Sequence, residues 1–146
     1  MLDKPAVRGI WIYGPPRIGK SHFVRQQEKD LFIKSQNKWW DGYAFQKAVL
    51  IDDFDKQGIC LSHHLKIWSD RYACSGEVKG GHVPLNYDRF YITSNYSIDE
   101  LYPVSEDTQL NLALKGRFKV IHMVDRNLDL IDYLQKSLSR SRSSSR

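Results

Sequence analysis

The segment of this chain that most constrains its fold is a run that matches the pattern G-x-x-x-x-G-K-S in full. The run consists of Gly14, Pro15, Pro16, Arg17, Ile18, Gly19, Lys20 and Ser21. Its glycines let the backbone curl so that successive N–H groups point at phosphate, and a helix that starts at its end contributes a positive terminus. We expect Lys20 to reach the β- and γ-phosphates of a bound nucleotide and the Ser21 hydroxyl to bind Mg²⁺.

The sequence on either side of this phosphate-binding loop supports that interpretation. Arg8–Tyr13 is apolar, with aromatic and branched residues, and is expected to form a strand. A helix is expected to begin at Gly19–Lys20 and to run to about Asp30. A strand before the loop and a helix after it are the context that separates a nucleotide-binding loop from an ordinary glycine turn. Tyr13 is expected to end the buried strand rather than to contact adenine.

A second distinctive segment is Lys47–Asp52, a continuous apolar run that closes in acids. Such a run is typical of a strand buried on both faces of a parallel sheet. It would deliver Asp52 and Asp53 to the edge of the sheet beside the phosphate-binding loop. We expect Asp52 to hold Mg²⁺ through water, and Asp53 to orient the attacking water or to accept its proton. Asp55 is expected to be a solvated turn residue.

A third strand is expected at Arg89–Ser94, followed directly by the amide side chain of Asn95. In a parallel sheet this end lies by the γ-phosphate, where Asn95 could hold the attacking water. Because asparagine also ends strands for reasons of turn geometry alone, this prediction depends on the two preceding segments.

The remaining segments complete an α/β pattern. Further strands are expected at Leu31–Lys34 and Phe118–Val124, helices at Leu61–Tyr72, Glu106–Leu114 and Leu128–Leu138, and a capping box at Ser97 and Glu100. Gly80-Gly81 lies between two short extended pieces and predicts a hairpin with a type I′ turn, which needs positive φ at both turn positions. Strands that alternate with helices indicate a mainly parallel sheet, to which the hairpin is the antiparallel exception.

Composition bounds the class of protein. The chain has 146 residues, of which 41% are hydrophobic and 27% charged, and this fits one globular domain. No stretch approaches the roughly 18 apolar residues of a membrane span, and the two cysteines are too few for a disulfide scaffold. We therefore expect a soluble protein of a reducing compartment. Net charge is +5, but much of it lies in the Ser/Arg-rich segment 139–146, which is expected to be a disordered tail.

The order and compact spacing of the phosphate-binding loop, the Asp52-Asp53 pair and Asn95 resemble the superfamily 3 helicases of small viruses. Asn37–Tyr43 (N-K-W-W-D-G-Y) and Val78–Pro84 (V-K-G-G-H-V-P) narrow the resemblance. These two segments look like those of the replication-initiator (Rep) proteins of circoviruses and related circular single-stranded DNA viruses. The resemblance covers roughly residues 9–124.

This resemblance implies a P-loop NTPase fold of the AAA+-like kind, a three-layer sandwich with a protruding β-hairpin, over residues 1–138. It implies an ATP- and Mg²⁺-dependent helicase that assembles into a homo-oligomeric ring, usually a hexamer, and moves along single-stranded DNA in the host nucleus. Lys79 is the matching residue of the hairpin that points into the central pore, and His82 lies across the same turn. A stiff turn could project one cation toward a phosphate backbone with little sequence preference.

The resemblance also implies an arginine finger, a cation that completes the site of a neighbouring subunit, and Arg117 is the candidate. Relatives often carry two adjacent arginines there, whereas this chain has Gly116 before Arg117. Arg17 stands where many relatives have a glycine inside the loop. The family's amino-terminal nuclease domain has no counterpart in this sequence, so we do not expect nicking and joining of DNA.

Two other functions fit the same motifs. A nucleotide kinase also pairs a phosphate-binding loop with a compact α/β domain, although the adjacent Asp52 and Asp53 favour water as the acceptor. A fragment that binds nucleotide or nucleic acid without forming rings is the other alternative. The residues do not separate DNA from RNA, because contacts to phosphate read neither base nor sugar. Trp39 and Trp40 could stack on bases or pack against the sheet.

Overall fold

The computed structural model describes residues 2–124 of the chain, which contain both strands and helices. The strands are β1 (Gly9–Tyr13), β2 (Leu31–Ile33), β3 (Ala48–Phe54), β4 (Ser75–Val78), β5 (Gly81–Pro84), β6 (Arg89–Ser94) and β7 (Phe118–His122). The helices are α1 (Lys20–Gln27), α2 (Ser62–Ser69), α3 (Ile98–Leu101) and α4 (Thr108–Arg117), with a 3₁₀ helix at Lys56–Leu61. The helix expected at 128–138 and the tail expected at 139–146 lie outside the described residues. Within residues 2–124, no helix has the length and apolar character needed to cross a membrane.

The central sheet brings together strands from distant parts of the sequence. Its strand order is β2-β3-β6-β1-β7, and every pairing is parallel. β1 therefore lies between β6 and β7, with Tyr13 opposite Ser94 on one side and opposite His122 on the other. Because all five strands run the same way, their carboxyl ends share one edge of the sheet. The expected parallel α/β sheet is confirmed, and the arrangement is that of a P-loop NTPase-like fold.

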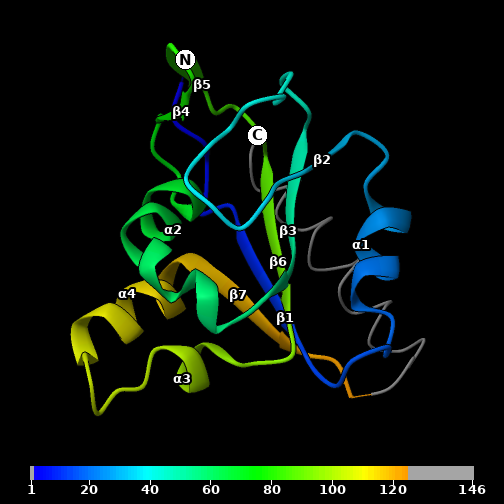
Figure 1. Ribbon diagram of the computed structural model, residues 1–146, viewed down its shortest axis with the longest axis vertical. Helices are drawn as coiled ribbons and strands as arrows, with labels where there is room; N and C mark the ends of the chain where they lie inside the picture. Colours follow the sequence, from blue (N-terminus) through cyan, green and yellow to red (C-terminus); the bar gives the residue numbers. More distant parts are fainter. Residues whose placement is uncertain (1, 125–146) are drawn as a thin grey trace.

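Helices cover both faces of this sheet, with α1 on one side and α2, α3 and α4 on the other (Figure 1). Alternation along β1 explains how both faces are buried. Trp11 packs with Trp68 of α2 and Leu114 of α4, whereas the next residue, Ile12, packs with Phe23 of α1. These five side chains are nearly inaccessible to solvent. The resulting three layers hold the carboxyl edge of the sheet, and thus the phosphate-binding loop, in place.

Three helices end at other residues than the sequence pattern predicts. Helix α1 stops at Gln27 rather than near Asp30, because Glu28 leaves the helical conformation with φ −113° and ψ 115°. The buried Glu28 carboxylate pairs with Arg89 and accepts a hydrogen bond of 2.6 Å from the Tyr91 hydroxyl, both on β6. Helix α2 also stops early, at Ser69 rather than Tyr72, and helix α4 continues to Arg117, beyond the expected end at residue 114. Contacts with the sheet, rather than local propensity, set the first of these ends.

The β4–β5 hairpin projects from the end of the molecule opposite the phosphate-binding loop (Figure 1). Val78 pairs with Gly81, so the two turn residues are Lys79 and Gly80. Gly80 has a φ of 90°, while Lys79 is not among the residues with positive φ. The hairpin is confirmed, but the type I′ turn expected at Gly80-Gly81 is wrong. Gly81 is used as the first residue of β5, and positive φ at the second turn position alone is the pattern of a type II turn.

Trp40 packs against strand β4 of this hairpin. Its backbone N–H donates to the carbonyl oxygen of Glu77 at 2.9 Å, and its ring lies so close to Gly76 that a Cβ there would come within 2.3 Å of the ring. The Trp40 ring is fully buried and stacks on Tyr87, with centroids 5.6 Å apart. Of the two alternatives for Trp40, packing against the sheet is therefore the one observed, while Trp39 remains 38% exposed.

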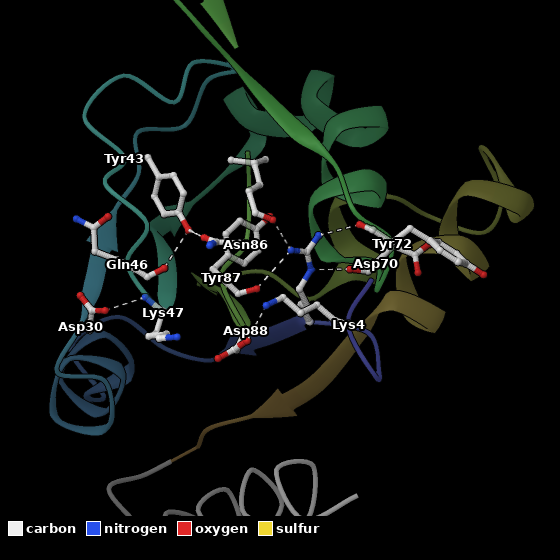
Figure 2. A network of polar contacts seen from close by, with 12 residues as sticks. Lys4, Asp30, Tyr43, Gln46, Lys47, Asp70, Tyr72, Asn86, Tyr87 and Asp88 are labelled. Atoms are coloured by element: carbon white, nitrogen blue, oxygen red, sulfur yellow. Dashed lines mark hydrogen bonds and ion pairs between the residues drawn. The ribbon is translucent and has the colours of Figure 1, made fainter. Parts of the chain in front are cut away.

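Arg8, expected only as the first residue of a strand, is a buried link between β1 and both ends of the hairpin. Its guanidinium donates to the carbonyl oxygens of Asp70 at 2.7 Å and Leu85 at 2.9 Å, which lie before β4 and after β5. It also lies over the Tyr87 ring, 4.4 Å from the centroid. Figure 2 shows the backbone carbonyl groups of Asp70, Tyr72 and Tyr87, which accept hydrogen bonds from this guanidinium. The hairpin is thus anchored to the strand whose other end carries the phosphate-binding loop.

Candidate nucleotide-binding site

The loop between β1 and α1 has a curled backbone. Arg17 and Gly19 have positive φ values of 64° and 105°, a conformation that turns successive peptide N–H groups toward a common point. Gly14 begins the loop in a position that no other residue could occupy, because a Cβ there would come within 2.0 Å of the Met123 carbonyl oxygen. The backbone directly after β7 therefore packs against the start of the loop. The side chain of Arg17 is exposed.

Lys20, the first residue of α1, has its ammonium group at the centre of the site. Its Nζ donates to the carbonyl oxygens of Gly14 at 2.8 Å and Pro15 at 2.7 Å, and to Asn95 Oδ1 at 3.2 Å. The side chain is 8% exposed. Burial lowers the pKa of Lys20, and the negative charges of Asp53 and Asp52 oppose that shift. The lysine thus joins the phosphate-binding loop to the end of β6.

The two acids of β3 lie where the strand pairing is interrupted. Pairing between β3 and β6 is regular up to Ile51 and resumes at Phe54, so that Asp52 and Asp53 form a bulge. Asp53 has a φ of 58°, an uncommon conformation for a residue with a side chain. Both acids are exposed, whereas the residues on either side of them are buried. The bulge therefore turns two successive carboxylates toward solvent at the carboxyl edge of a buried strand.

Thr93 of β6 is the residue of this site that sequence reasoning missed. Its Oγ1 donates to Asp52 Oδ1 at 2.6 Å and accepts a hydrogen bond from the backbone N–H of Asp53 at 3.0 Å. One hydroxyl therefore holds both acids of the bulge. The only signal in the sequence is a hydroxyl residue near the end of the strand that leads to Asn95. The pairing of β3 with β6 brings this hydroxyl to the two acids.

Asn95 follows β6 in a turn that three hydrogen bonds stabilise. The Ser94 hydroxyl donates to the Phe54 carbonyl oxygen at 2.6 Å and accepts from the Tyr96 N–H at 3.0 Å. The Trp11 indole N–H donates to the Tyr96 carbonyl oxygen at 3.0 Å. These contacts hold the exposed Asn95 amide beside Lys20.

Ser21 lies half-buried in the first turn of α1, and its Oγ accepts a hydrogen bond of 3.0 Å from Arg25 Nε. A hydroxyl oxygen has a second lone pair for a further partner. A hydroxyl and exposed carboxylates are hard oxygen donors of the type that Mg²⁺ prefers. The donor set formed by Ser21 and Asp52, together with the loop at Gly14 and Lys20, thus fits a magnesium–nucleotide complex.

The other residues expected to function lie away from this cluster. Arg117 ends α4 directly before β7, so it lies at the amino edge of the parallel sheet, opposite the phosphate-binding loop. Its Nε donates to Asp70 Oδ2 at 3.0 Å and its Nη1 to the Ala113 carbonyl oxygen at 2.9 Å. Lys79 and His82 are exposed on the hairpin. The chain brings Lys20, Asp52, Asp53 and Asn95 together and keeps Arg117, Lys79 and His82 apart from them.

Comparison with known proteins finds a helicase family and viral replication proteins that are similar to this chain. A model of the RNA helicase family matches residues 10–69. The chain is 42% identical to the replication-associated protein of Porcine circovirus 1 over 94 residues, which is 62% of this chain and 30% of that protein. It is 38% identical to that of Beak and feather disease virus over 84 residues, 58% of this chain and 28% of that protein. For Human associated cyclovirus 1 the identity is 34% over 103 residues, 66% of this chain and 36% of the relative. The aligned segment thus spans about a third of these relatives.

Proposed function

The chain carries a helicase-type domain like that of the circovirus replication-associated (Rep) proteins, and we propose that it is an ATP-hydrolysing superfamily 3 helicase domain acting on single-stranded nucleic acid. The observation that supports this proposal is the convergence of a cation, two carboxylates and an amide on one phosphate-binding loop. These groups belong to Lys20, Asp52, Asp53 and Asn95, from α1, β3 and the end of β6. The identity to circovirus proteins favours DNA over RNA, replication of circular single-stranded DNA, and the host nucleus as the place of action.

In the proposed reaction, the loop N–H groups and Lys20 bind the phosphate oxygens and offset the charge that develops on the γ-phosphate. Asp53 accepts the proton of the attacking water, and Asn95 orients that water. Ser21 and Asp52 hold Mg²⁺, which supplies further charge neutralisation when bound. Thr93 keeps Asp52 and the backbone of Asp53 in position.

The predicted functional residues outside the cluster are assigned to contacts with a neighbouring subunit or with nucleic acid. We propose that Arg117 serves the site of a neighbouring subunit in a ring, since its distance from the loop of its own chain leaves it no role there. Lys79 and His82, exposed on a hairpin that Arg8 and Trp40 anchor, are proposed to contact the phosphates of the nucleic acid. The motor would then comprise residues 1–138.

The test is steady-state ATP hydrolysis, measured across a series of protein concentrations with no addition, with oligo(dT), with oligo(U) or with nucleosides. We expect turnover per chain to rise with protein concentration and with oligo(dT), and Lys20→Ala to abolish it. Lys29→Ala, an exposed lysine after α1, is the matched control and should behave as wild type. Stimulation by a nucleoside instead would identify a phosphotransferase, and ATP binding with no turnover under any condition would overturn the motor.

A further inference from the structure

The rings of Tyr13 and His122 form a stacked pair beside the phosphate-binding loop. Their centroids are 4.4 Å apart and their planes differ by 3°. The two residues pair directly across β1 and β7, and Gly14, the first residue of the loop, follows Tyr13. Tyr13 is half-buried and packs against the core, whereas His122 is exposed. The stack is therefore backed by the core on one side and open on the other.

The position of the Tyr13–His122 pair relative to the carboxylates and the amide indicates which part of a bound nucleotide could reach it. Asn95, Asp52 and Asp53 lie at the ends of β6 and β3, on one side of β1. Within residues 2–124, β7 is the strand on the other side of β1 and the edge of the sheet. A nucleotide whose γ-phosphate meets the carboxylates and the amide must extend its ribose and base away from them. The direction away from β6 and β3 leads across β1 to His122.

We propose that the exposed ring of His122 stacks on the purine base of the bound nucleoside triphosphate, with the Tyr13 ring behind it. This inference deepens the proposed function, because it names the group that recognises the base in that same site. An aromatic ring held by a second ring loses little freedom when a base stacks on it, and base–aromatic stacking contributes about tenfold or more to affinity. The pair selects for an aromatic base and leaves the phosphates to the loop.

The test compares the binding of Mg·ATP with that of Mg·tripolyphosphate, which has the phosphates but no base, by isothermal titration calorimetry. His122→Ala should weaken ATP binding about tenfold and leave tripolyphosphate binding unchanged. His122→Phe should retain the wild-type affinity for ATP. Val120→Ala is the matched control, because Val120 is an exposed residue of the same strand and lies two positions before His122, hence on the same face.

A second readout reports on stacking itself. The fluorescence of 2-aminopurine riboside triphosphate is quenched when its base stacks on a ring, so wild-type protein and His122→Phe should quench it on binding and His122→Ala should not. Equal ATP affinity in His122→Ala and wild type would overturn the inference. A parallel loss of ATP and tripolyphosphate binding would also overturn it, because the ring would then act only on the fold of the loop. If wild-type protein binds tripolyphosphate but gains no affinity from the base, the inference fails while the phosphate site stands. If it binds neither, the proposed function itself fails.

Discussion

The Thr93 hydroxyl donates a hydrogen bond of 2.6 Å to Asp52 Oδ1 and accepts one of 3.0 Å from the N–H of Asp53. A single side chain on β6 thereby sets the direction of both acids on β3. Both acids are exposed, and the regular pairing of β3 with β6 is interrupted between Ile51 and Phe54. The positions of the proposed metal and water sites therefore depend on a residue that is itself assigned to neither role.

Thr93→Val should reveal this dependence. Valine has a similar shape but leaves the Asp53 N–H without an acceptor, which is expected to lower the free energy of unfolding by about 1–3 kcal/mol. We also expect a several-fold higher Mg²⁺ concentration for half-maximal ATP hydrolysis. Urea unfolding and a Mg²⁺ titration of turnover measure the two effects. Thr93→Ser keeps the hydroxyl and should stay near wild type; equal Mg²⁺ requirements in all three proteins would contradict the positioning role.

Asp53→Asn should separate nucleotide binding from cleavage. The amide keeps the size of the side chain but cannot accept the proton of the attacking water. Turnover should therefore fall about 10²-fold or more, while the Kd for Mg·ATP changes little. Glu106→Gln, which removes a negative charge from an exposed residue elsewhere, is the control. If Asp53→Asn loses Mg·ATP binding instead, Asp53 belongs to the metal site.

Lys34 makes the stability of the fold depend on pH. Its Nζ donates to the carbonyl oxygens of Asn37 and, at 2.8 Å, Trp39, and it lies over the rings of Trp40 and Trp68, 5.1 and 4.8 Å from their centroids. Burial lowers the pKa of Lys34 to about 7. Above pH 7 and up to the usual lysine pKa near 10.5, the unfolded chain binds more protons than the folded one. The free energy of unfolding should therefore rise with pH through this window. Below pH 7, Lys34 is protonated in both the folded and the unfolded chain, so it should not make the free energy of unfolding depend on pH.

Urea unfolding between pH 6 and pH 10 tests this expectation. Lys34→Met should flatten the rise by an amount on the order of a few kcal/mol, because methionine fills the site without titrating. The same substitution at the exposed Lys29 should leave the slope as in wild type. An unchanged slope in Lys34→Met would show that Lys34 stays protonated in the folded protein.

Lys79→Ala should weaken the binding of single-stranded DNA without changing basal ATP hydrolysis. Lys79 is exposed at the hairpin turn, far from the phosphate-binding loop. Removal of one phosphate contact should reduce the slope of log K against log salt by about 0.7 for a single strand. Fluorescence anisotropy of labelled oligo(dT) at several salt concentrations measures this slope, with Lys29→Ala as control. An unchanged slope would remove the hairpin lysine from the nucleic-acid interface.

Arg117→Ala should lose turnover alone and recover part of it when mixed with Lys20→Ala protein. Each variant then supplies the group that the other lacks, since the finger and the loop of one active site come from different subunits. Activity measured against the mixing ratio should pass through a maximum. Because Arg117 also pairs with Asp70, Asp70→Asn controls for loss of that ion pair. A mixture no more active than its parts would leave Arg117 with the structural role alone.

Several features of the fold and site follow from short stretches of sequence. The phosphate-binding loop, the strand that carries Asp52 and the capping box at Ser97 and Glu100 appear where the sequence predicts them, although the strand continues past Asp52 to Phe54. The capping box satisfies its hydrogen bonds within four residues, and the loop and the strand are indicated by the residue types of their own segments. The parallel sheet follows in turn from strands separated by helices or long connections.

Other features come from residues that are far apart in the sequence. Thr93 acquires its role only because β6 pairs with β3, and the positive φ of Asp53 arises from the bulge in that pairing. Arg8 becomes the anchor of the hairpin only when Asp70 and Leu85 meet beside it.

The sequence by itself thus determined which residues could bind phosphate, hold a metal or activate water, since that chemistry resides in side chains and local backbone. The tertiary structure decided which of them meet. It joins Lys20 to Asn95 at 3.2 Å, stacks Tyr13 on His122 and places Arg117 at the opposite edge of the sheet. The physical reason is that strand order and register depend on the burial of both faces of the sheet, a property of the whole chain that no single segment encodes.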